Sequence, residues 1–158
     1  MKSIAFKLIA VVALAFPAFA KDEHKHAVKE GPNGGRVLSA VEPHLEFLVT
    51  KERKVQIIAL TDDLKPATLT GQVITVTGGD RAKPTKLQFK EENGKLLSSN
   101  ALPEGNDYPV SVSIKKDAGG KAVYEKFNLN LENCPTCNHQ EYACICDHVQ
   151  EAKEAKKK

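Results

Sequence analysis

The stretch His44-Leu-Glu-Phe-Leu-Val-Thr-Lys-Glu-Arg-Lys-Val-Gln-Ile-Ile-Ala-Leu60 decides the fold class. Apolar and polar residues alternate over residues 44–50, which predicts a strand with one buried and one solvated face. Residues 55–60 continue the pattern, but Ile58 and Leu60 make that strand apolar on both faces. The second strand is therefore expected in the middle of a sheet.

Period-two patterns continue along the chain and predict further strands at residues 69–77, 85–90, 96–99, 108–115 and 122–131. Asn93-Gly94 and Gly119-Gly120 separate neighbouring strands and are typical of hairpins, and Gly78-Gly79-Asp80 predicts another turn. Because no part of this region carries a helical stripe, residues 31–131 are predicted to form an all-β fold. We expect a single antiparallel β-sandwich of immunoglobulin-like size, with a Cys/His-rich C-terminal appendage.

Residues 1–20 have the pattern of a secretory signal peptide. Lys2 and Lys7 precede an apolar run, and Ala18-Phe-Ala20 gives a small-x-small cleavage pattern. The apolar run is too short for a comfortable membrane span, so a membrane-embedded protein is not expected. These features predict a periplasmic or secreted protein.

Removal of residues 1–20 takes away Lys2 and Lys7 and no acid, so 21 basic and 20 acidic residues remain. A nearly neutral chain lacks the positive field that binds nucleic acid. Residues 21–30 are charged and carry His24 and His26, which predicts a flexible leader; the charged tail at 149–158 is expected to be solvated. Gly31-Pro-Asn-Gly-Gly35 predicts a turn at the start of the sandwich.

All four cysteines of the protein lie in the segment 132–148, together with two of its five histidines. Thiolate sulfur and imidazole nitrogen are the ligands that zinc and copper prefer. We therefore expect a transition-metal site whose ligands are the four cysteines, with the two histidines as alternates: Cys134, Cys137, Cys144, Cys146, His139 and His148.

The two halves of this segment differ in how readily they bind one ion. Cys134-Pro-Thr-Cys137 has the spacing in which a tight turn brings two sulfurs to one point. In an extended strand, the sulfurs of Cys144-Ile-Cys146 would face opposite ways, so this half must bend to join the same ion.

Two structural disulfides are the main alternative, because an exported protein meets an oxidising environment. A thioredoxin-like redox centre is disfavoured, since no helical stripe follows Cys137, and Asn138 interrupts the Cys-x-x-Cys-His pattern of haem attachment. His44 and Glu46 would share a strand face and suit an accessory metal site or a hydrogen-bonded pair. No catalytic arrangement stands out, so an enzyme is not expected.

The residues Gly31-Pro-Asn-Gly-Gly-Arg-Val-Leu38 and Pro43-His-Leu-Glu-Phe-Leu-Val49 resemble small exported β-domains that accompany bacterial heavy-metal efflux systems of the resistance-nodulation-division type. The resemblance covers roughly residues 31–60. The Cys/His segment is similar to segments carried by some periplasmic adaptors of those systems, but it departs from them in having Cys-x-Cys. Long coiled-coil hairpins and lipoyl-like halves, which an adaptor needs, are missing.

The resemblance implies an accessory metal-binding or metal-sensing protein, with an efflux component as a partner. The sequence as a whole predicts an exported protein that binds or delivers zinc- or copper-type ions. The alternative it leaves open is an exported interaction domain stapled by disulfides and without metal.

Overall fold

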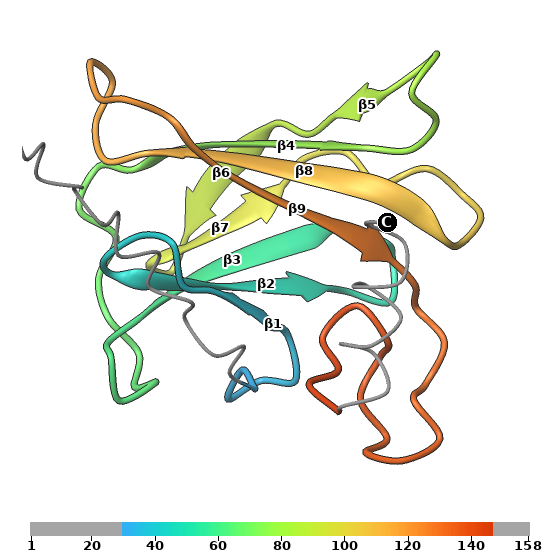
Figure 1. Ribbon diagram of the computed structural model, residues 1–158. Coiled ribbons are helices and arrows are strands. Elements are labelled where there is room, and N and C mark those ends of the chain that lie inside the picture. The colour runs from blue at the N-terminus through green and yellow to red at the C-terminus, as the bar shows by residue number, and fades with distance from the viewer. Residues whose placement is uncertain (1–29, 147–158) are drawn as a thin grey trace, which may run out of the picture.

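A computed structural model of the chain describes residues 30–146 (Figure 1). The predicted signal peptide at 1–20, nearly all of the leader with His24 and His26, His148 and the charged tail lie outside the described residues. From 30 to 146 the structure contains strands, turns and loops and no α-helix. No helix there is long and apolar enough to cross a membrane.

The described chain forms nine strands: β1 (Arg36–Leu38), β2 (His44–Val49), β3 (Val55–Leu60), β4 (Val73–Gly78), β5 (Thr85–Lys86), β6 (Phe89–Glu92), β7 (Lys95–Ser98), β8 (Tyr108–Lys115) and β9 (Val123–Leu129). A five-stranded sheet has the order β1-β2-β3-β7-β6, and a four-stranded sheet has the order β5-β4-β8-β9. All pairings are antiparallel. The two sheets pack face to face (Figure 1), which confirms the predicted all-β sandwich.

The predicted turns form where their residues permit them. Asn93 and Gly94 both have positive φ, of 52° and 74°, and join β6 to β7 as a two-residue hairpin with Glu92 opposite Lys95. Residues 116–122 connect β8 to β9, where the Asp117 carbonyl and carboxylate accept hydrogen bonds from Gly120 and Gly119. The turn at Gly79 has a φ of 103°.

Residues 85–90 were expected as one strand, but the chain changes sheets within this range. β5 pairs with β4, whereas β6 pairs with β7 in the opposite sheet. Leu87, between the two, donates its N–H to Val76 O at 2.8 Å and is buried in the core. The chain therefore passes along one side of the sandwich and links its two sheets.

On the other side of the sandwich, side chains join β9 to β1 and to the residues that follow it. The Arg36 guanidinium lies 4.9 Å from the centre of the Phe127 ring, which is a cation–π contact. The Glu125 carboxylate accepts a hydrogen bond from the N–H of Ala40 at 3.1 Å. These contacts tie β9 to the chain at and just after β1.

β3 is central in its sheet, as predicted, but β2 is not half-buried. His44 is 6% exposed and Glu46 is fully buried, so the expectation of a solvated face on β2 is wrong. A small second cluster of Val37, Ile58 and Leu60 lies outside the main core. The loop before β1 folds over the same region, and it covers a face that the alternating pattern of β2 assigns to solvent.

Candidate metal centre

The cysteine segment starts at residue 132, shortly after the end of β9, and forms a small hairpin-like loop. Asn133 and Gln140 make an antiparallel bridge, and inside it Cys134 donates its N–H to His139 O at 2.7 Å. Asn138 closes the turn with a φ of 61°, a conformation that asparagine tolerates, and donates its N–H to Cys134 O at 3.1 Å. The Cys-x-x-Cys spacing therefore makes the expected tight turn.

Tyr142 anchors this loop to the sandwich. Its side chain is 2% exposed and packs in the main core, with its ring centroid 6.0 Å from that of Phe47 and 6.3 Å from that of Phe127. The Tyr142 hydroxyl accepts a hydrogen bond from the backbone N–H of Val49 at 3.1 Å. The Tyr142 carbonyl accepts a further bond from Arg36 Nη1 at 3.3 Å. The position of the neighbouring Cys144 is thus fixed by the core itself.

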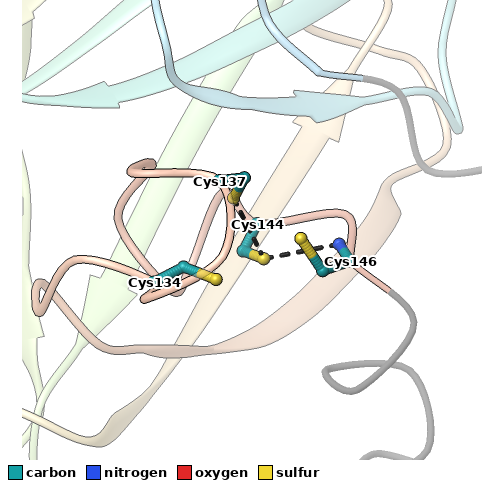
Figure 2. Close-up of side chains that lie close together, drawn as sticks. All are labelled: Cys134, Cys137, Cys144 and Cys146. Carbon is teal, nitrogen blue, oxygen red and sulfur yellow. Dashed lines mark hydrogen bonds between the residues drawn. The ribbon is translucent and has the colours of Figure 1, made fainter.

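The four cysteine sulfurs converge on one point (Figure 2). All four Sγ atoms lie within 4.8 Å of one another, and the Sγ atoms of Cys137 and Cys144 are 3.5 Å apart. Zinc–sulfur bonds of about 2.3 Å in a tetrahedron separate neighbouring sulfurs by about 3.8 Å. The arrangement therefore has the size of a tetrathiolate site and could hold a metal ion.

The Cys-x-Cys half reaches the site because it bends. Residues 144–146 are not in a strand, and the backbone N–H of Cys146 points to Cys144 Sγ at 3.4 Å. A matching contact joins the Thr136 N–H to Cys134 Sγ at 3.4 Å. Each half of the segment thus donates an N–H to a sulfur of its own first cysteine, which favours the thiolate form that binds metals.

Burial divides the four thiols into two pairs. The side chains of Cys134 and Cys144 are 0% and 1% exposed, whereas Cys137 and Cys146 are half-buried. The site therefore has a closed side toward the sandwich and an accessible side toward solvent.

The pKa values of Cys134 and Cys144 are shifted in opposite directions. Desolvation raises the pKa of Cys134, but hydrogen bonds from the backbone N–H groups of Cys137 and Thr136 and from neighbouring thiols outweigh it and lower the pKa to about 6. Burial raises the pKa of Cys144 well above its ordinary range; the bond from the Cys146 N–H opposes this rise, but burial and the hydrogen bonds to the neighbouring thiols outweigh it. Four thiolates this close repel one another, so full ionisation of the cluster calls for a cation at its centre.

His139 lies beside the cluster, but its ring nitrogens are not among the ligand atoms that converge there. Its Nε2 is 2.7 Å from Glu30 Oε1, and its ring approaches Gly34 in the turn before β1. His139 thus joins the cysteine loop to the loop at residues 31–35, and the two lie side by side in Figure 1. The other alternate ligand, His148, is outside the described residues.

His44 and Glu46 do not form a shared site. His44 Nδ1 is 2.9 Å from Val41 O, and its Nε2 lies 3.6 Å from Asp62 Oδ1. Glu46 instead accepts hydrogen bonds from Asn33 N, Asn33 Nδ2 and Gly35 N, at 2.9, 2.7 and 2.9 Å. These bonds replace the expected pairing, because the loop at 31–35 folds over Glu46 and supplies its donors.

Sequence reasoning missed Tyr142 and the role of Glu46 in fixing the loop at 31–35. A large aromatic residue within a polar, cysteine-rich segment was the available signal for Tyr142. For Glu46 the available signal was the pair of glycines, Gly31 and Gly35, in the loop before β1. In the structure a Cβ on Gly31 would lie 2.3 Å from Glu46 Oε1, and one on Gly35 would lie 2.8 Å from Glu46 Cγ.

Comparisons of the chain with protein-family models, with curated proteins and with solved structures gave no match. Function is therefore inferred from the site itself.

Proposed function

We propose that this protein is an exported transition-metal-binding protein that buffers or delivers a zinc- or copper-type ion through Cys134, Cys137, Cys144 and Cys146. The convergence of four sulfurs within 4.8 Å carries the proposal. Four cysteine sulfurs close enough to surround one ion favour zinc, although copper(I) also binds soft sulfur ligands.

The anchoring of the loop supports a site that exists before the metal arrives. Tyr142 is held by the core, and the backbone N–H groups of Tyr142 and Glu141 donate to Asn130 O at 3.0 Å and to Glu132 O at 2.9 Å. None of these contacts involves a sulfur atom. A preformed site binds a metal ion without the entropic cost of ordering a loop, and this raises its affinity for the ion.

The division of the thiols into a buried and an accessible pair supports exchange of the ion rather than permanent retention. An incoming ligand can approach from the side of Cys137 and Cys146, which are half-buried. Delivery to an efflux component agrees with the resemblance of residues 31–60 to β-domains that accompany such systems.

The test begins with the full chain expressed with residues 1–20 and the protein recovered from the export compartment. We expect an intact mass that lacks residues 1–20, one bound metal ion in the native mass spectrum, and four alkylatable thiols after denaturation. Cobalt titration of the reduced protein should give the sulfur-to-metal charge-transfer bands of a tetrathiolate site. Cys134→Ser should abolish this spectrum, whereas Thr136→Ala, an exposed change in the same loop, should leave it intact.

The disulfide-stapled interaction domain predicts the opposite result. A protein short of four hydrogens, without metal and without free thiols, would refute the metal-binding function. In that case Cys134→Ser should lower stability and leave metal binding negligible throughout.

A further inference from the structure

Two of the four sulfurs are already in contact. Cys137 Sγ lies 3.5 Å from Cys144 Sγ, and neither of these two cysteines is in a disulfide in the structure. A disulfide bond of about 2.05 Å requires these two sulfurs to approach by about 1.5 Å. The two cysteines come from opposite halves of the segment, so a bond between them would tie both halves together.

The two thiols of this pair differ in their access to solvent. Cys137 is half-buried, whereas Cys144 is 1% exposed, and Figure 2 shows Cys144 between Cys137 and Cys146. A reagent from solution therefore meets Cys137 first, and Cys144 is reached only from within the cluster. This is the arrangement of an attacking thiol and a resolving thiol in disulfide exchange.

The loop can be oxidised without leaving the sandwich. The Tyr142 ring and the backbone bonds to Asn130 and Glu132 hold it in place. Oxidation therefore changes the ligands and leaves their support intact.

Resting on the proposed metal-binding function, we propose that the same thiols carry a second activity: dithiol–disulfide exchange with a small disulfide, which links Cys137 to Cys144 and discharges the metal ion. The Cys137 thiolate attacks one sulfur of oxidised glutathione, forms a mixed disulfide and expels one glutathione thiolate. The Cys144 thiolate then attacks the Cys137 sulfur, expels the second glutathione thiolate and closes the bond. Two cysteine thiolates are oxidised, one glutathione disulfide is reduced to two thiolates, and no proton is consumed.

Loss of two ligands is sufficient to release the ion. Only Cys134 and Cys146 remain as ligands once the Cys137–Cys144 bond has closed, and two sulfurs do not complete the four-coordinate shell of a zinc site. The redox state of the surroundings therefore decides whether the protein holds or releases its metal, which suits a protein that delivers its cargo.

The experiment uses the full mature protein, reduced and titrated with zinc alone before any oxidant is added. Oxidised glutathione is then added, released zinc is followed with a chromophoric chelator, and the remaining thiols are alkylated for peptide mapping. We expect release of all the bound zinc in parallel with formation of a Cys137–Cys144 disulfide. Cys144→Ser should accumulate the glutathione mixed disulfide at Cys137, whereas Cys146→Ser should still close the Cys137–Cys144 bond.

The outcomes separate this inference from the function on which it rests. Zinc binding by the reduced protein, followed by retention of both zinc and four thiols in excess oxidised glutathione, overturns the exchange activity alone. A first disulfide between Cys134 and Cys137, or one that includes Cys146, also overturns the exchange activity. Failure of the reduced protein to bind zinc in the initial titration overturns both proposals.

Discussion

Substitution of Tyr142 tests whether the core holds the cysteine loop in place. Tyr142→Phe keeps the buried ring and removes only the hydroxyl that accepts the Val49 N–H at 3.1 Å. The N–H of Val49 is part of a buried contact and would lose its acceptor, which costs about 1–3 kcal/mol. Tyr142→Ala also removes a ring that is 2% exposed and in contact with Phe47 and Phe127, and deletions of this size cost about 3–5 kcal/mol.

Urea denaturation of the reduced, metal-free protein measures both changes. A loss of about 2 kcal/mol moves the midpoint by about 1–2 M when the denaturant dependence is about 1–2 kcal/mol/M. Tyr142→Ala should in addition weaken zinc binding, because the competent, docked fraction of the loop falls. Tyr142→Phe should leave zinc binding nearly unchanged, since the ring still docks.

Tyr124→Phe provides the matched control. Tyr124 lies on β9 and is 63% exposed, so the same chemical change there should alter the free energy of unfolding by less than about 0.5 kcal/mol. If Tyr142→Ala were no more destabilising than Tyr124→Phe, the loop would not be anchored through the core. The account of a preformed site would then be refuted.

Three further predictions concern the loops around the site. Glu46→Gln should lower the free energy of unfolding by about 1–3 kcal/mol, because bonds from the N–H groups of Asn33 and Gly35 lose their charged acceptor; an unchanged urea midpoint would contradict this. His139→Ala should leave the zinc stoichiometry of the reduced protein intact, because the ligand atoms that converge are the four sulfurs; loss of the ion in native mass spectrometry would make His139 a ligand. Removal of the metal with a chelator should lower the thermal midpoint by mass action and leave the strand signal in circular dichroism, since the main core lies between the sheets; collapse of that signal would show that the metal is needed for folding.

Much of the architecture follows from local patterns that the sequence displays. Alternation of apolar residues marks β2, β8 and β9, because every second side chain of a strand points to the same face. Asn93-Gly94 specifies a hairpin, since both residues accept the positive φ that a two-residue turn requires. The spacing of Cys134 and Cys137 likewise specifies a turn that brings two sulfurs together.

Other features depend on segments that meet only after folding. Residues 85–90 have one continuous strand pattern, yet they divide between two sheets, because a pattern of period two does not identify the partner strand. Glu46 occupies a polar position in the alternating pattern of β2. It is nevertheless fully buried, because the loop at 31–35 packs over it.

Local patterns along the chain are enough to predict a β-sandwich, and they place all four cysteines in one short segment. The meeting of four sulfurs within 4.8 Å, two of them on buried and two on half-buried residues, is visible only in the folded chain. The physical reason is that Cys144-Ile-Cys146 has no local signal for its bend. Tyr142 packs in the core two residues before Cys144, and the chain after it bends so that Cys144 and Cys146 lie close to Cys134 and Cys137 (Figure 2).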